Sequence, residues 1–120
     1  MSTANASIDD LVARFIEIGV KQDEALLEDR TAEFNRLYKQ KSAIIAELRA
    51  REGDQRRALI PLYNHPNMQV RLNAATATLA TAPEAARQVL EDIQASKMPP
   101  QALHAGMTIF NLDEGIFKPA

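Results

Sequence analysis

Apolar residues recur at spacings of three and four along most of this chain, and such spacing is typical of amphipathic α-helices. No stretch shows the alternation that a half-buried strand needs. The first predicted helix covers residues 8–27, and Ser7 is expected to cap its N-terminus. Its apolar stripe consists of Ile8, Leu11, Val12, Phe15, Ile16 and Gly19. We place a break at Glu28 and Asp29, with Asp29 expected to cap the helix that follows.

The second predicted helix covers residues 30–51 and ends before Gly53, a typical stop residue. Its apolar face consists of Phe34, Leu37, Tyr38, Ile44, Ile45 and Leu48. Lys41 interrupts this face. We expect its stem to lie on apolar surface while its ammonium reaches water.

A third, shorter helix is predicted over residues 55–63, capped by Asp54. Pro61 lies inside it and is expected to bend it, because proline lacks the backbone N–H that an α-helix uses. Residues 64–67 form a turn, since Pro66 disfavours helix at the residue before it. Asn67 is then expected to cap an alanine-rich helix over residues 68–80.

Two more helices are predicted over residues 83–95 and 100–112, the first opening with Pro83, which is favoured at a first helical position. The last helix carries Leu103, Gly106, Met107, Ile109 and Phe110. Beyond Gly115, the apolar Ile116 and Phe117 are expected to dock onto the fold. The pattern as a whole predicts an all-α fold of about six helices, packed as antiparallel neighbours.

The composition is consistent with this all-α fold and limits its size, chemistry and location. A length of 120 residues suits a single domain over 1–120. The absence of cysteine excludes disulfides and thiolate chemistry. The N-terminus does not resemble a signal peptide, and no window is apolar enough to span a membrane, so we expect a cytoplasmic protein that does not contact membranes.

Charge is unevenly distributed along the chain. The formal net charge is −2, which disfavours a general nucleic-acid binder. Residues 9–33 nevertheless carry a net −5, and residues 36–57 carry a net +4. Two solvated helix faces that neutralise each other explain this pattern. A basic patch for an acidic partner is the alternative.

The segment "LIPLYNHPNMQVRLNAATATLA", residues 59–80, resembles a HEAT repeat. It combines an apolar, proline-containing helix, a polar turn, Val-Arg and an alanine-rich helix. The resemblance implies a right-handed α–α superhelix in which Val70 is a buried anchor and Arg71 bonds a neighbouring repeat. The usual aspartate is replaced here by His65, so the customary Asp–Arg ladder is not expected.

A resemblance over nearly the whole length rests on "LVARFIEIGVKQDEALL", "FNRLY", "GDQRRALIPLYNHPNMQVRLNAA" and "DEGIFKPA". On these segments the chain resembles a family of short bacterial proteins catalogued as a domain of unknown function. The family is similar to HEAT-like superhelices, and some related domains are associated with toxin loci. The resemblance therefore implies a binding scaffold, in one version a toxin-neutralising protein.

Catalytic and metal-binding patterns are weak. The adjacent acidic pairs point about 100° apart on a helix and make poor acid–base dyads. His104 is expected to be a partly buried helix residue without ligand partners. The six aromatic residues lie mostly on apolar stripes and are assigned to the core. We therefore expect no enzyme activity, no metal and no cofactor.

The candidate partner-binding residues are Arg56, Arg57, His65 and Arg71. Arg56 and Arg57 are expected to lie near the 64–67 turn, where Arg71 joins them. The leading hypothesis is a non-enzymatic protein–protein interaction module. The alternatives are a self-associating structural protein, for instance a homodimer, and a nucleic-acid-binding HEAT-like protein that uses residues 36–57.

Overall fold

The computed structural model describes residues 3–120, and within them the fold is all-α, as predicted. Five α-helices and one 3₁₀ helix follow one another, without a strand in the described residues. Their bounds are α1 (Ile8–Leu27), α2 (Thr31–Ala50), η1 (Gln55–Asn64), α3 (Met68–Ala77), α4 (Pro83–Ser96) and α5 (Gln101–Asp113). The predicted helices are confirmed in number and order, with ends that differ by at most three residues.

Local chemistry explains most helix ends. The Ser7 hydroxyl accepts a hydrogen bond from the Asp10 N–H at 3.0 Å, and the Asn67 side chain accepts one from the Val70 N–H at 3.1 Å. Both predicted caps are therefore confirmed. Asp54 also caps as predicted, because its carboxylate accepts the Arg56 N–H at 3.3 Å.

The predicted role of Asp29 is wrong. Asp29 has a φ of 56°, in the left-handed region, and Arg30 takes the N-cap position of α2. The Arg30 N–H donates to the Ala25 carbonyl at 2.8 Å, which closes a Schellman-type end of α1. Asp29 therefore ends the first helix instead of starting the second, because aspartate tolerates the left-handed conformation that this motif requires.

The third element is a 3₁₀ helix and not the bent α-helix expected around Pro61. Its buried residues are Arg56, Leu59 and Leu62, spaced three apart. That spacing matches the three residues per turn of a 3₁₀ helix, so one straight stripe faces the core.

The alanine-rich helix α3 ends at Ala77, three residues earlier than predicted. The Thr78 hydroxyl donates to the Ala74 carbonyl at 2.8 Å and also pairs with the Tyr63 hydroxyl. These side-chain bonds compete with continuation of the helix. The chain turns over residues 78–82, and α4 begins with Pro83 as predicted.

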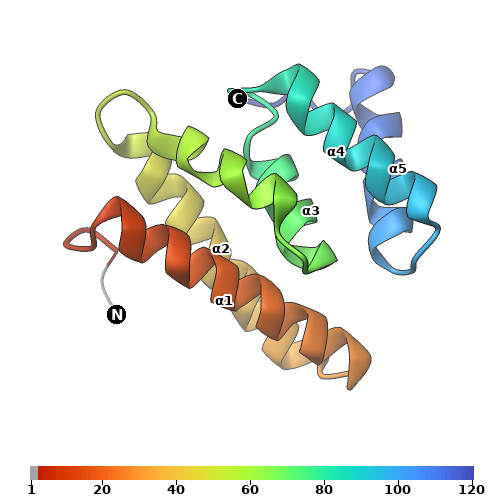
Figure 1. Cartoon of the computed structure of the whole chain (residues 1–120), viewed down its shortest axis with the longest axis horizontal. Coiled ribbons are helices and arrows are strands. Elements are labelled where there is room, and N and C mark those ends of the chain that lie inside the picture. The colour runs from red at the N-terminus through yellow and green to blue at the C-terminus, as the bar shows by residue number, and fades with distance from the viewer. Residues whose placement is uncertain (1–2) are drawn as a thin grey trace.

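The helices pack as three antiparallel pairs, α1 with α2, η1 with α3, and α4 with α5 (Figure 1). Helix α3 lies between the other pairs and contacts both α1 and α4. Its Val70, Ala74 and Ala77 belong to a core shared with α1, α2 and η1. Its Leu72 and Ala75 belong to a second core shared with α4 and α5. Small side chains on α3 thus allow one thin helix to join two cores.

Gly19 brings α1 and α3 close together. A Cβ atom at this position would lie 2.7 Å from Val70 Cγ2 and 3.2 Å from Val70 Cα. The first of these distances is shorter than real Cβ contacts, so only glycine fits this crossing. Val70 itself is fully buried, as the sequence predicted.

The assignment of the aromatic residues to the core is wrong for three of them. Tyr38, Phe110 and Phe117 are 53%, 57% and 37% exposed. Leu103 and Met107 of α5 are also exposed, so no other element in residues 3–120 covers that face of the helix. In the tail, Phe117 lines a cleft but is itself 37% exposed, and Ile116 is 69% exposed, so docking of the tail is only partly confirmed. No helix in residues 3–120 has the length and apolar character needed to cross a membrane.

Candidate functional site

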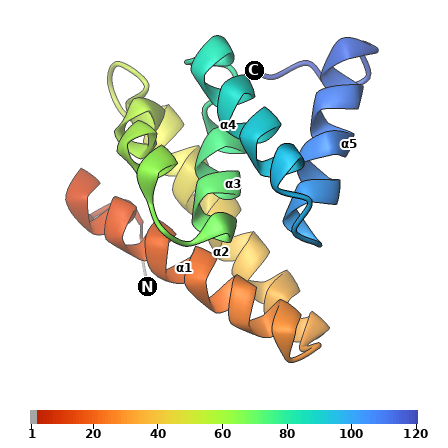
Figure 2. The ribbon, with the colours of Figure 1, turned by 45° about the vertical axis from the view of Figure 1, so that its right-hand side comes forward.

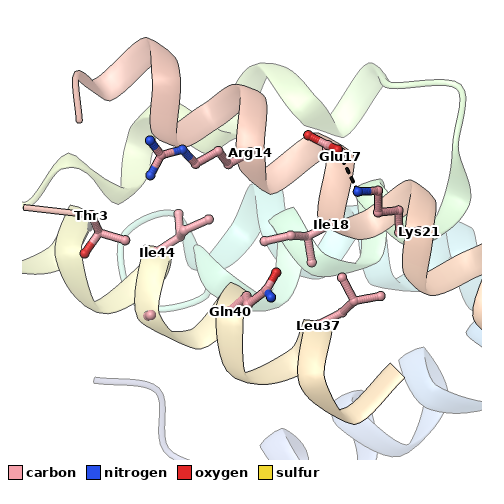
Figure 3. Close-up of a pocket in the computed structure, with 9 residues that line it drawn as sticks. Thr3, Arg14, Glu17, Ile18, Lys21, Leu37, Gln40 and Ile44 are labelled. Atoms are coloured by element: carbon pink, nitrogen blue, oxygen red, sulfur yellow. Dashed lines mark ion pairs between the residues drawn. The ribbon is translucent and has the colours of Figure 1, made fainter. Parts of the chain in front are cut away.

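A groove of about 310 Å³ runs between α1 and α2 (Figure 3). Ile18, Leu37 and Ile44 line it with apolar surface. At its rim, the Glu17 carboxylate pairs with the Lys21 ammonium at 2.8 Å. This ion pair lowers the pKa of Glu17 and raises that of Lys21. Because the charges of Glu17 and Lys21 neutralise each other, neither is readily available to bind a charged ligand.

Arg56 and Arg57 do not lie at the 64–67 turn, so that expectation is wrong. They stand at the start of η1, whereas the turn follows its end, about 18 Å along a 3₁₀ helix. The Arg57 guanidinium donates to the Thr81 carbonyl at 2.8 Å, beyond the end of α3. In an antiparallel pair, the start of one helix lies beside the end of the next. The Arg56 side chain is buried and pairs with Asp54 at 2.6 Å.

His65 and Arg71 do lie together, at the turn before α3. The Arg71 guanidinium donates to the His65 carbonyl at 2.8 Å and to the Pro66 carbonyl at 3.2 Å. His65 Nδ1 accepts the Asn67 N–H at 3.0 Å. Arg71 therefore bonds its own turn, and the four predicted residues form two separate structural groups.

A second cleft, of about 330 Å³, lies between α2, α3, α5 and the C-terminal tail. We call it the cationic cleft. Its polar and charged lining includes Tyr38, Lys41, Arg49, Arg56, Asn73 and His104. No aspartate or glutamate is among the described residues that line it. Because Asp54 neutralises Arg56, the positive charge of the side chains comes from Lys41 and Arg49. Ala120, which carries the α-carboxylate, also lines the cleft.

Lys41 is the most unusual group in the cationic cleft. Its Nζ donates to Asn73 Oδ1 at 3.3 Å and lies 4.7 Å from the centroid of the Tyr38 ring. No carboxylate in the described part of the chain pairs with it. Burial lowers the pKa of Lys41 to about 8. Lys41 is partly exposed and lines the cleft, so the expectation that its ammonium reaches water is met only in part.

A buried polar network positions Lys41. Asn73 Oδ1 also accepts from Gln69 Nε2 at 3.0 Å, and Asn73 Nδ2 donates to Gln22 Oε1 at 2.8 Å. Gln101 Nε2 of α5 donates to Gln69 Oε1 at 3.0 Å. The network thus joins α1, α2, α3 and α5 behind the cleft. It leaves one buried donor, Gln22 Nε2, without a partner among the described residues.

His104 contributes to the cationic cleft from α5. It is more exposed than the sequence suggested, yet its pKa is lowered, because part of it is removed from water and Lys41 lies nearby. The imidazole is consequently neutral near pH 7.

The sequence contained one signal for this site that our predictions did not use. Gln22, Gln69, Asn73 and Gln101 are buried polar residues on helices with apolar neighbours. Buried amides need partners, so they indicate a network. Which helices the network joins depends on packing.

In residues 3–120 the histidine and acidic side chains form no group of three or more suited to a metal ion.

Comparison with known proteins gives two matches. The family described as "Domain of unknown function (DUF2019)" matches residues 9–113. The crystal structure of the protein RPA1889 from Rhodopseudomonas palustris CGA009 is similar, with a TM-score of 0.97 and 50% sequence identity. The similarity covers 100% of this chain and 99% of that one. None of the curated proteins matches the chain.

Proposed function

This chain belongs to the DUF2019 family of domains of unknown function, and we propose that it is a non-enzymatic module that binds an acidic segment of another protein in the cationic cleft. The observation that carries the proposal is Lys41, a largely buried cation with no carboxylate partner in the described residues. A buried charge without a counter-charge is costly. A carboxylate supplied by a partner would remove that cost.

The shape of the cationic cleft supports a protein ligand. A volume of about 330 Å³ accommodates a few side chains. Ile45 and Leu72 line the cleft with apolar surface beside the cations, so an acidic residue next to an aliphatic one matches both features. Nucleic acid is a poorer match, because the chain is acidic overall and the cleft is short.

We also propose that the three helix pairs form a short HEAT-like right-handed superhelix. The support is the antiparallel arrangement of η1 with α3, flanked by α1–α2 and α4–α5 (Figure 1). Such scaffolds present continuous surfaces for binding. A toxin-neutralising role in the cytoplasm is a more specific version, and a toxin gene adjacent to this gene would support it.

The test is binding of a fluorescent peptide that alternates glutamate and leucine, measured by anisotropy. We expect binding that weakens about tenfold or more when Lys41 and Arg49 are both changed to glutamine, because charge-assisted bonds contribute about 1.5–3 kcal/mol. The matched control changes Arg36 and Lys39 to glutamine. Both residues are exposed on α2 outside the cleft. Their replacement removes the same two positive charges as the replacement of Lys41 and Arg49.

Two results would contradict the proposal. One is equal affinity for the same peptide with glutamine in place of glutamate. The other is tighter binding of a single-stranded oligonucleotide than of the acidic peptide, with the same dependence on Lys41 and Arg49. That result would indicate a nucleic-acid-binding cleft instead.

A further inference from the structure

The outer face of α5 carries a stripe of large exposed apolar side chains. Leu103, Met107 and Phe110 are 68%, 57% and 57% exposed. Their spacing of four and three residues places them on one face of the helix. Figure 2 shows α5 at the edge of the molecule, with α4 on one side of it only. Adjacent apolar patches of this kind mark interaction sites.

A shallow groove of about 590 Å³ accompanies the stripe. Ala102 and Gly106 line it between the larger side chains. Gly106 lies near the middle of α5, and the projecting Leu103 and Phe110 lie on either side of it. Gln94 and Lys97, at the end of α4, also line the groove, so it lies along the side of the stripe that faces α4. A stripe on one helix can pack against the same stripe of a second copy turned by 180°.

Charges at the two ends of the stripe are opposite. Lys97 lines the groove just before α5, and Glu114 continues the stripe at the end of the helix, four residues after Phe110. Neither residue forms an ion pair with another described residue. The neighbouring Asp113, by contrast, is held by Arg87 at 2.7 Å. An antiparallel second copy would bring each Lys97 toward the other copy's Glu114.

We infer that this face binds a second copy of the chain, with α5 antiparallel to α5 about a two-fold axis near Met107. The apolar stripe and the opposite terminal charges both satisfy this arrangement. Because the contact is confined to one face of one helix, we expect a weak dimer whose population depends on concentration. The inference does not rest on the acidic-peptide proposal, which concerns the cationic cleft.

Exchanging the charges of Lys97 and Glu114 tests this geometry. The molar mass of the full chain is measured by sedimentation equilibrium. The wild-type mass is expected to rise with concentration toward twice the 13.3 kDa of one chain. Lys97→Glu alone and Glu114→Lys alone should each weaken association several-fold, because like charges then face each other. The double variant carrying both changes should recover wild-type association, since each pair is restored with its sign reversed.

Met107→Lys gives a second test at the centre of the face, where we expect association at least about tenfold weaker. Leu27→Lys is the matched control, because Leu27 is 82% exposed at the end of α1 and belongs to neither the stripe nor the groove. A monomer at all accessible concentrations would overturn the inference. So would a double variant that associates no better than the single ones. The glutamine variant of Lys41 and Arg49 should dimerise normally, which separates failure of this inference from failure of the cleft proposal.

Discussion

At the scale of single residues, Lys41 shows what hydrophobic patterning can and cannot predict. The pattern correctly indicates a cation that interrupts an apolar face. It does not indicate whether the ammonium escapes to water, because that depends on α3, more than 30 residues further along the chain. Asn73 of α3 accepts a hydrogen bond from it at 3.3 Å, and burial lowers its pKa to about 8.

The lowered pKa of Lys41 predicts a specific pH dependence of stability. The unfolded chain has the ordinary lysine pKa of 10.5, so it binds more protons than the folded chain between about pH 8 and pH 10.5. The free energy contributed by Lys41 therefore disfavours folding below pH 8, and this penalty is relieved as the pH rises. Lys41→Met should be more stable than wild type near neutral pH, by about 1–3 kcal/mol.

Urea unfolding at several pH values measures this difference. We expect the advantage of Lys41→Met to shrink as the pH approaches about 10. Lys39→Met, exposed on the same helix, should show no comparable change. An advantage of Lys41→Met that stays constant with pH would contradict a perturbed lysine.

At the scale of elements, helix positions and most caps follow from local sequence. Ser7, Asp54 and Asn67 cap as predicted, because capping depends on residues within one turn. The 3₁₀ form of η1 and the early end of α3 were missed. The early end of α3 depends on a contact between Tyr63 and Thr78, which only tertiary packing creates.

The close crossing of α1 and α3 predicts opposite effects for two glycines. Gly19→Ala should destabilise the fold by about 1–3 kcal/mol, because its Cβ would meet the Val70 side chain and backbone. At Gly106 a Cβ would meet mainly the flexible end of Gln94, at 2.8 Å. Gly106→Ala should therefore be neutral or stabilising by up to about 1 kcal/mol, through helix propensity.

Thermal and urea unfolding of both variants in dilute solution checks this prediction. Equal effects of the two substitutions would show that helix propensity, and not the α1–α3 distance, dominates. A more stable Gly19→Ala variant would contradict the packing described for this crossing.

At the scale of the whole molecule, the all-α architecture was predictable and the site was not. Helical periodicity and turn residues are local signals, and they yield the pairs of antiparallel helices. The cationic cleft instead combines Lys41 and Arg49 with His104 and the tail, which are distant in sequence. The candidates Arg56, Arg57, His65 and Arg71 were chosen because the 64–67 turn was expected to bring them together, and folding gives each an internal partner.

The central claim is that Lys41 is a cation with no carboxylate partner in the described residues and that it binds a carboxylate of another protein. NMR titration of its side chain tests this claim most directly. Selective detection of the Lys41 ε-methylene should give a pKa of about 8 in the free protein. The pKa should rise once the glutamate–leucine peptide is bound, because an opposite charge favours the ammonium form. An ordinary pKa in the free protein, or a pKa that the bound peptide leaves unchanged, would contradict the account.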